Sequence, residues 1–271
     1  MNLAPSITLS VVSHGHGELL LNLLADLDEA PSLKGVTVVV TLNLPGERLA
    51  TERFANLRIE IIRNTSPRGF GANHNQAFRV CRTPWFAILN PDLRVPATSF
   101  PDLMAGVLDD PASPDLMAPR VVNPAGALED SVRGNLTPWS VVLRVARRIL
   151  GRSNALPPDD SRFRWFAGMF YLVRSSAYDA IGGFDERYFL YCEDFDLCAR
   201  LHLAGARLLH ARQATVIHDA RRDSHRAGRH LKLHLRSMAR VWSSSPVWKI
   251  ALENVGLRRP PARRGKTADV L

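Results

Sequence analysis

The chain has 271 residues, of which 46% are hydrophobic and 23% are charged, with 17 Gly and 18 Pro. These proportions are typical of a globular protein and exclude the disordered, collagen-like and coiled-coil classes. No apolar run approaches the roughly 18 residues of a membrane-spanning helix, and the N-terminus has no secretory leader pattern. Because the three cysteines have no paired or metal-finger spacing, we expect a reducing, cytoplasmic environment.

The positive charge is concentrated at the C-terminal end. The formal net charge is +9, and residues 221–271 alone carry 13 basic and 3 acidic side chains. We therefore expect a near-neutral body over residues 1–220, a basic helical segment over 221–255 and a disordered Arg/Pro-rich tail over 256–271. The basic residues favour an anionic membrane surface as a partner. A solvated tail that only aids solubility is the alternative.

Short apolar runs alternate with helical patterns along the first hundred residues. Strands are expected at 7–12, 36–40, 58–63 and 85–89, and helices at 18–27 and from 72 onward. This alternation predicts a layered α/β fold with a mostly parallel sheet. In such sheets ligands bind beyond the carboxyl ends of the strands.

The second half of the chain gives weaker patterns. Residues 111–164 are rich in Pro, Asn and Gly, and we expect loops there with one helix over 139–150. The elements expected after this region are a strand at 166–173, helices at 175–181 and 193–204, a strand at 214–217 and a basic helix at 225–242.

Two residues that follow predicted strands are candidate metal ligands. In Asn90-Pro91-Asp92 the carboxylate comes directly after a buried strand. A single Asp at that point suits a divalent cation that keeps several waters and binds substrate phosphates. Asn-Pro-Asp is also a common turn sequence. His218 follows the last strand and is either a metal ligand or a structural histidine.

Three acidic residues open the helix predicted at 193–204. They are Glu193, Asp194 and Asp196, and the helix dipole stabilises negative charge there. Successive helical residues diverge by about 100°, so the three side chains point in different directions. One of them can face a cleft as a base while another forms an ion pair, for instance with Arg200. Simple N-terminal helix charge is the alternative.

A glycine-containing loop precedes the second helix. Gly69 and Gly71 flank Phe70, and a Gly-x-Gly turn that leads into a helix offers backbone amides to an anion. The pattern differs from the dinucleotide fingerprint, because the third glycine is absent and Asn73 stands near its place.

Taken in order, these motifs resemble the family 2 glycosyltransferases, and more narrowly their bacterial rhamnosyltransferase-like members. The resemblance covers about residues 7–242 and is most specific over 182–200. It implies the GT-A fold, a three-layer α/β/α sandwich with a nucleotide-binding half at about 1–110 and an acceptor half at about 111–220. It also implies a nucleotide-diphosphate sugar donor, Mg²⁺ or Mn²⁺, and inversion at the anomeric carbon.

The resemblance also implies roles for single residues. It makes Asp194 the general base and places the metal on Asp92 and His218. The residues that it implies around the donor are Ser13, His14, Thr41, Asn43, Gly69, Gly71, Asn73, Asn90 and Asp92. Those expected around the acceptor are Trp165, Gly168 and Glu193, although Trp165 fits a core position equally well. The family's usual Asp after the second strand is replaced by Thr-Leu-Asn, which leaves a uridine and a thymidine donor open.

These assignments predict an inverting glycosyltransferase that moves a sugar, with rhamnose as the candidate, from a dTDP- or UDP-sugar. The expected acceptor is a saccharide or a polyprenyl-linked saccharide of a cell-surface glycan, and the expected location is the inner face of the cell membrane. One alternative is a sugar-nucleotide nucleotidyltransferase, but the loop after the first strand lacks a basic pair. The other is a nucleic-acid-binding protein, which leaves the acidic motifs unexplained. We therefore expect no nucleic-acid partner.

Overall fold

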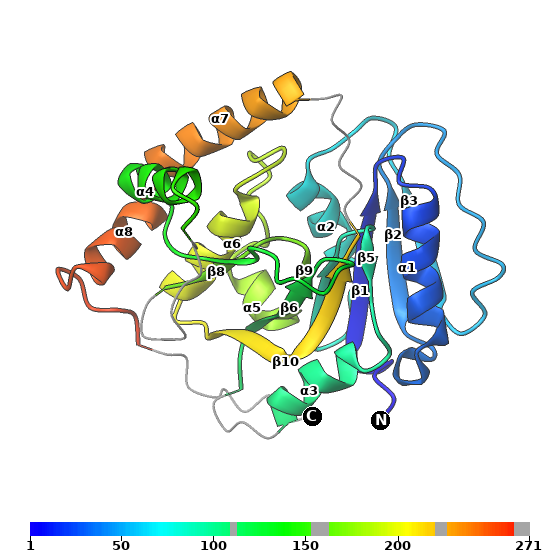
Figure 1. Cartoon of the computed structure of the whole chain (residues 1–271). Coiled ribbons are helices and arrows are strands. Elements are labelled where there is room, and N and C mark those ends of the chain that lie inside the picture. The colour runs from blue at the N-terminus through cyan, green and yellow to red at the C-terminus, as the bar shows by residue number, and fades with distance from the viewer. Residues whose placement is uncertain (109–112, 153–162, 220–226, 263–271) are drawn as a thin grey trace.

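The computed structural model describes residues 1–108, 113–152, 163–219 and 227–262, and an eight-stranded mixed sheet forms its centre (Figure 1). The strands follow the order β3-β2-β1-β4-β9-β6-β10-β5. Their bounds are β1 Ile7–Ser13, β2 Thr37–Leu42, β3 Arg58–Arg63, β4 Trp85–Leu89, β5 Leu93–Arg94, β6 Leu116–Val122, β9 Phe170–Arg174 and β10 Leu208–His218. A separate small sheet pairs β7 (Val132–Arg133) with β8 (Trp165–Phe166).

The first four strands of the chain are parallel to one another, as the sequence predicted. β2 pairs with β1 and β3, and β1 pairs with β4. β9 runs antiparallel to both β4 and β6, and β10 runs parallel to β6. β1, β2, β3, β4, β6 and β10 therefore share one direction, and their carboxyl ends lie at the same edge of the sheet.

Alternate side chains of the strands enter two cores, one on each face of the sheet. On β4, Trp85 and Leu89 belong to a core shared with α1 (Glu18–Glu29) and α3 (Ser99–Leu108). Phe86 and Ile88 belong to the core on the other face, which includes side chains of α2, α5 and α6. The bounds of those helices are α2 Phe70–Phe78, α5 Ser175–Ala180 and α6 Glu193–Leu203. This alternation is the two-residue period of a strand, and it confirms the three-layer α/β/α arrangement.

Between residues 111 and 164 the helix expected at 139–150 is confirmed by α4 (Pro138–Ile149), but β6 lies inside the sheet between β9 and β10, where only loops were expected. Pro119 hides this strand from the sequence pattern, since proline has no amide to give to a central ladder. In the structure Pro119 pairs with Ala211, and the register of β10 shifts between Ala211 and Thr215. The proline therefore lies at an irregularity of the ladder, where it is tolerated.

Two other predicted strands have different bounds. The single strand expected at 166–173 is broken into β8 and β9, and a turn joins them, in which the Met169 amide donates to the Ala167 carbonyl at 2.7 Å. The strand expected at 214–217 begins earlier, at Leu208. The break between β8 and β9 places the Gly168 amide near the start of α6.

Three helices gather on one side of the molecule (Figure 1): α4 (Pro138–Ile149), α7 (Ala227–Ser243) and α8 (Ser245–Asn254). α7 confirms the predicted basic helix from residue 227 onward, and Val247 and Ile250 of α8 enter the core beneath α6. Of the predicted disordered tail, residues 263–271 lie outside the described part of the chain, and residues 256–262 form neither helix nor strand. None of the helices in the described ranges has the length and apolar character to cross a bilayer.

Candidate functional site

Most of the predicted site residues lie at the carboxyl edge of the parallel strands. Ser13 ends β1, Asn43 follows β2, Asn64 follows β3 and His218 ends β10, while Asp92 comes three residues after the end of β4. This is the edge at which α/β sheets bind ligands. The fold thus brings together residues from five separate strands.

Asp92 and His218 are in direct contact. Asp92 Oδ2 lies 3.3 Å from His218 Nε2, and the backbone amide of Asp219 donates to the backbone carbonyl of Asp92 at 2.8 Å. On the other side of the ring, Glu129 Oε2 lies 2.9 Å from His218 Nδ1. Burial by itself lowers the pKa of this imidazole, but the two carboxylates outweigh burial and raise the pKa of His218 to about 9.

Once the proton of its ring is displaced, His218 forms with Asp92 a pair that fits a divalent cation. Asp92 Oδ1 is buried and has no hydrogen-bond partner among the described residues. Glu129 on the far ring nitrogen is the kind of carboxylate that orients a metal-binding histidine. Within the described ranges no group of three or more His, Cys, Asp or Glu side chains is placed to hold a metal. The pair therefore suits a cation that takes its remaining ligands from water and substrate phosphates.

Asp194 lies in the first turn of α6 and lines a cavity of about 400 Å³. Its Oδ1 accepts a hydrogen bond from the Phe195 amide at 2.8 Å, and its Oδ2 accepts one from the Gly168 amide at 3.2 Å. Burial raises the pKa of Asp194, although these amides and the charge of Arg133 partly oppose it. A carboxylate of raised pKa that faces a cavity has the properties of a general base. Four other predicted residues line the same cavity: Asn90, Trp165, Gly168 and Glu193.

Glu193 has a different environment from its neighbour. Its side chain is only 5% exposed, and its Oε2 has no partner in the described part of the molecule. Burial, followed by the charge of Asp194, raises the pKa of Glu193 to about 8. For Glu193, burial therefore opposes the stabilisation of negative charge that the helix dipole provides at this end of α6. Asp196 forms the expected ion pair with Arg200, at 2.7 Å.

The turn before α6 has an unusual backbone. Tyr191 and Cys192 have φ angles of 73° and 64°, in the left-handed region. Each such non-glycine residue costs about 1–3 kcal/mol, and such residues cluster at functional sites. Contacts with α7 hold the turn: Tyr191 Oη lies 2.6 Å from His230 Nδ1, and Ser237 Oγ donates to the Leu190 carbonyl at 2.8 Å.

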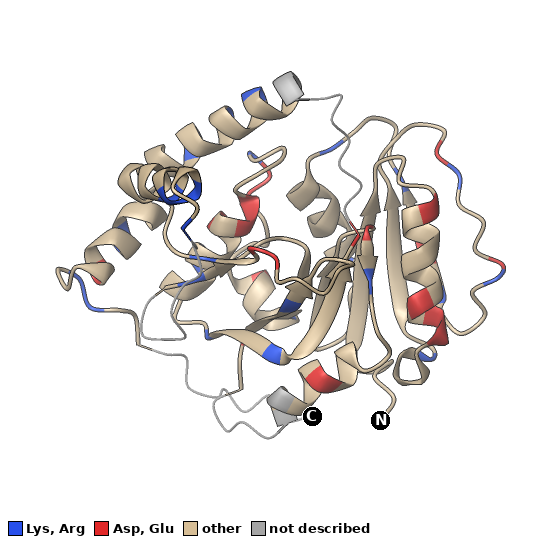
Figure 2. Cartoon of the chain, in the orientation of Figure 1, with Lys and Arg blue, Asp and Glu red and all other residues tan. Residues whose placement is uncertain are grey.

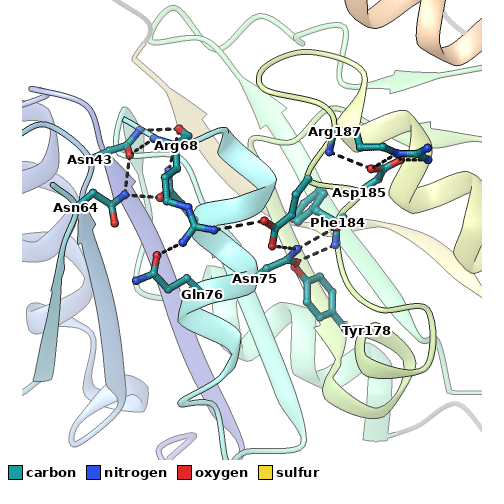
Figure 3. Close-up of polar contacts among 11 residues, drawn as sticks. Asn43, Asn64, Arg68, Asn75, Gln76, Tyr178, Phe184, Asp185 and Arg187 are labelled. Carbon is teal, nitrogen blue, oxygen red and sulfur yellow. Dashed lines mark hydrogen bonds and ion pairs between the residues drawn. The ribbon is translucent and has the colours of Figure 1, made fainter. Parts of the chain in front are cut away.

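At the ends of β2 and β3, asparagine side chains form a network (Figure 3). Asn64 Nδ2 donates to Asn43 Oδ1 at 2.8 Å and to Asn73 Oδ1 at 2.7 Å. Asn43 also accepts from the Arg68 amide at 2.8 Å and donates to the Arg68 carbonyl at 3.0 Å. Asn73 is fully buried in this network, and Thr41 is fully buried within β2. Asn73 therefore holds the loop between β3 and α2 in place through its buried hydrogen bonds.

Ser13 and His14 lie beside Glu47, which the sequence reasoning missed. The Ser13 hydroxyl donates to Glu47 Oε1, and the Gly15 amide donates to the same oxygen at 3.1 Å. His14 Nδ1 lies 3.3 Å from Asn43 Nδ2. Glu47 thus supplies a carboxylate at this edge of the sheet, although none follows β2 directly.

Close packing explains why positions 69 and 71 are glycine. A Cβ at Gly69 would lie 2.8 Å from the Phe189 carbonyl oxygen, and a Cβ at Gly71 would lie 2.5 Å from Phe184 Cβ. The amide of Phe70 donates to the Phe189 carbonyl at 2.9 Å. These contacts correct the idea that the turn is open for an anion, because its neighbours are residues of the 182–190 segment.

Asn75 joins α2 to the 182–186 segment (Figure 3). Its Oδ1 accepts from the Tyr178 hydroxyl at 2.6 Å and from the Phe184 amide at 2.9 Å. Its Nδ2 donates to the Phe184 carbonyl at 2.9 Å and to Glu186 at 3.1 Å. No role for Asn75 was predicted from the sequence, and the structural role of this segment emerges only from the fold.

The chain matches the family model described as Glycosyl transferase family 2 over residues 46–157. Rhamnosyltransferase WbbL of Escherichia coli (strain K12) is 46% identical over 86 residues, which cover 30% of this chain and 33% of WbbL. N-acetylglucosaminyl-diphospho-decaprenol L-rhamnosyltransferase of Mycobacterium tuberculosis (strain CDC 1551 / Oshkosh) is 31% identical over 174 residues, which cover 56% of this chain and 53% of the relative. The matched regions thus span about a third to a half of the length of these relatives.

Among solved structures, the mannosyltransferase PcManGT from Pyrobaculum calidifontis, in complex with GDP-Man and Mn²⁺, has a TM-score of 0.61 at 19% identity. The alignment covers 93% of this chain and 70% of that chain. This likeness concerns the fold, and it agrees with the layered sheet described above. Over residues 46–157 the chain is similar to glycosyltransferase family 2, and it has the GT-A fold.

Proposed function

We propose that this chain is an inverting glycosyltransferase that moves a sugar from a nucleotide-diphosphate donor to a saccharide acceptor. The observation that carries the proposal is the position of Asp194. Its carboxylate, of raised pKa, shares a cavity with Asn90, and Asn90 is two residues from Asp92, the partner of His218. A single displacement needs both a base for the acceptor and a site for the charged leaving group.

In the proposed reaction Asp194 accepts the proton of the acceptor hydroxyl while the oxygen attacks the anomeric carbon. The bond between that carbon and the donor diphosphate breaks on the opposite face, and the diphosphate leaves with the electron pair. Asp92 and His218 would hold Mg²⁺ or Mn²⁺, which when bound neutralises the negative charge of the donor phosphates. We assign the contacts with the nucleotide to Ser13, His14 and Asn43, at the carboxyl ends of β1 and β2.

For the donor we propose an activated rhamnose, carried by dTDP or UDP. The support is the identity of the two relatives, each of which is named as a rhamnosyltransferase. The carboxylate of Glu47 at the end of β1 adds an acceptor of hydrogen bonds for a nucleotide at this edge. The proposed location is the cytoplasmic side of the cell membrane, to which the chain would bind peripherally.

For the acceptor we propose a saccharide carried on a polyprenyl diphosphate, as in the name of the mycobacterial relative. Arg133, Arg144 and Arg148 line the cavity beside Asp194. Asp130 pairs with Arg133 at 3.6 Å and also pairs with Arg144, so one carboxylate serves two guanidinium groups. This side of the cavity therefore keeps a positive charge, and guanidinium groups bind phosphates with two parallel hydrogen bonds.

The test is transfer by the purified chain. It is incubated with dTDP-rhamnose, UDP-sugars and a GDP-sugar, with Mn²⁺ or with EDTA, and with N-acetylglucosaminyl diphosphate on a short prenyl chain. We expect the acceptor mass to rise by one sugar, with release of the nucleoside diphosphate, in the presence of the metal only. Failure of every nucleotide sugar in the panel to bind in calorimetry would overturn the proposal.

A further inference from the structure

α4 exposes apolar residues that a globular protein normally buries. None of its side chains is buried. The large apolar residues that are more than half exposed on it and at its end are Trp139, Val142, Leu143, Val145, Ile149 and Leu150. At about 100° per residue these side chains occupy one continuous side of the helix. A contiguous exposed apolar patch of this kind marks an interaction surface.

The other side of α4 is basic. Arg144, Arg147 and Arg148 lie at helical spacing on it, and the helix contains no Asp or Glu. Arg147 and Arg148 are exposed. An amphipathic helix with arginines on its polar side and with Trp, Leu and Ile on its apolar side is the type that lies in the interface of an anionic bilayer.

α7 and α8 lie beside α4 (Figure 1). The Trp139 ring of α4 contacts the Trp248 ring of α8, with centroids 5.7 Å apart, and Trp242 Nε1 of α7 donates to the Leu136 carbonyl at 2.9 Å. The exposed apolar residues of α7 and α8 include Leu231, Leu235, Trp248 and Leu252. Basic side chains lie on all three helices (Figure 2). We call the exposed apolar residues of α4, α7 and α8, with their flanking Lys and Arg, the docking face.

We propose that the docking face binds the surface of an anionic lipid bilayer. The charge of the face selects this occupant, because its arginines complement lipid phosphates while its apolar residues enter the headgroup boundary. A second copy of the chain is a poor match: in a two-fold dimer the same patch meets itself, and α4 has no acidic side chain to offer the arginines of its copy.

The docking face lies next to the proposed reaction centre. The cavity that contains Asp194 is lined by Arg144 and Arg148 of α4 and by His234 and Met238 of α7. A bilayer on this face therefore lies beside the cavity, and a lipid-linked acceptor reaches Asp194 while its prenyl chain stays in the membrane. This step rests on the proposed function, whereas membrane binding itself is independent of it.

Flotation with vesicles tests the binding. The whole chain is mixed with vesicles of phosphatidylcholine alone or of phosphatidylcholine with phosphatidylglycerol at low and at high salt. We expect binding to the anionic vesicles that weakens with salt, and a loss of tenfold or more for the double variant Val142→Asp/Ile149→Asp. Its matched control is Val80→Asp, which changes an apolar residue that is 41% exposed on the turn between α2 and β4. Arg147→Glu and the exposed Arg82→Glu form a second pair for the charge.

Three results would overturn the proposal: no flotation of the wild-type chain, equal flotation of the double variant and the wild type, or a wild-type dimer that the double variant turns into a monomer. The residues changed lie outside the cavity lining, so unaltered melting and nucleotide binding show that the variants fold. Transfer to the short-prenyl acceptor in solution separates the two proposals. If the double variant transfers sugar to the short-prenyl acceptor at the wild-type rate in solution but more slowly to an acceptor in vesicles, both proposals hold. If the wild-type chain transfers no sugar at all, the proposed function fails, and flotation still tests membrane binding.

Discussion

Asp194 receives a hydrogen bond at 3.2 Å from the backbone amide of Gly168, in the break between β8 and β9. The Phe195 amide holds the other carboxylate oxygen. Both amides favour the ionised form, while burial favours the protonated form. Backbone amides therefore orient the carboxylate, and a substitution of Asp194 removes the carboxylate while it leaves both amides in place.

Asp194→Asn is expected to lower the rate of transfer by about 10²–10⁴-fold, because an amide cannot accept the proton of the acceptor hydroxyl. Donor affinity should stay within about twofold, since the change lies on the acceptor side. Release of nucleoside diphosphate measures the rate and calorimetry measures the affinity. The control is Asp179→Asn on the exposed side of α5. A wild-type rate for Asp194→Asn would remove the residue from the mechanism.

Glu193→Gln is expected to stabilise the protein at alkaline pH. The pKa of Glu193 is about 8 in the folded chain, above its ordinary value of 4.5. Between these values the unfolded chain has released the proton and the folded chain still binds it, so wild-type stability falls as pH rises. Gln has no such proton. Relative to wild type, the variant should gain on the order of 1 kcal/mol or more between pH 4.5 and pH 8.

The measurement for this prediction is the melting temperature of both proteins at the two pH values. A gain of 1 kcal/mol corresponds to about 2–4 °C in a chain of this size. Glu60→Gln, on an exposed position of β3, is the matched control and should show no pH-dependent difference. A constant difference between wild type and Glu193→Gln across this range would mean that Glu193 is already ionised in the folded state.

The strands that frame the site were predictable because they are short, apolar and separated by loops. The bounds expected for β3 and β4 agree with the structure. β6 was not predictable, since Pro119 is compatible with a central strand only next to a register shift in β10. That shift depends on the partner strand, so the local sequence contains no sign of it.

The same limit applies to the candidate site. Asp92, Asp194 and His218 each follow or begin an element whose sequence pattern is clear. Glu129 and Glu47 come from segments without a motif, and the topology of the chain brings them to His218 and Ser13. Residues that touch the site through the fold alone have no local signal in a single sequence.

Asp92→Asn is expected to weaken the Mn²⁺-dependent part of nucleotide-diphosphate binding by tenfold or more, because changes to groups behind a metal ligand already cost about 10–100-fold. Binding in EDTA should be unchanged. Calorimetry with and without Mn²⁺ measures both quantities. The control is Asp219→Asn, because Asp219 contacts Asp92 through its backbone amide, which the substitution keeps. Equal Mn²⁺ dependence in Asp92→Asn and wild type would exclude Asp92 as a ligand.

Asn75→Ala separates a packing role from a chemical role for the 182–186 segment. The substitution removes four hydrogen bonds and leaves the Tyr178 hydroxyl and both backbone groups of Phe184 without this partner. Each unsatisfied buried group costs about 1–3 kcal/mol, so we expect the free energy of unfolding to fall by several kcal/mol. The melting temperature should fall by about 2–4 °C for each kcal/mol lost. Gln76→Ala, which loses one bond from Arg68, is the control and should lose less than about 1.5 kcal/mol.

If packing is the role of this contact, the folded Asn75→Ala protein should bind the donor with an affinity within a few-fold of wild type below its melting temperature. Asn75 contacts Tyr178, Phe184 and Glu186, and none of these lines the cavity that contains Asp194. The opposite pattern, an unchanged melting temperature with lost donor binding, would show that the segment contacts substrate. Melting curves and calorimetry on the same preparation distinguish the two roles, because stability responds to the buried hydrogen bonds and affinity responds to the groups that touch the ligand.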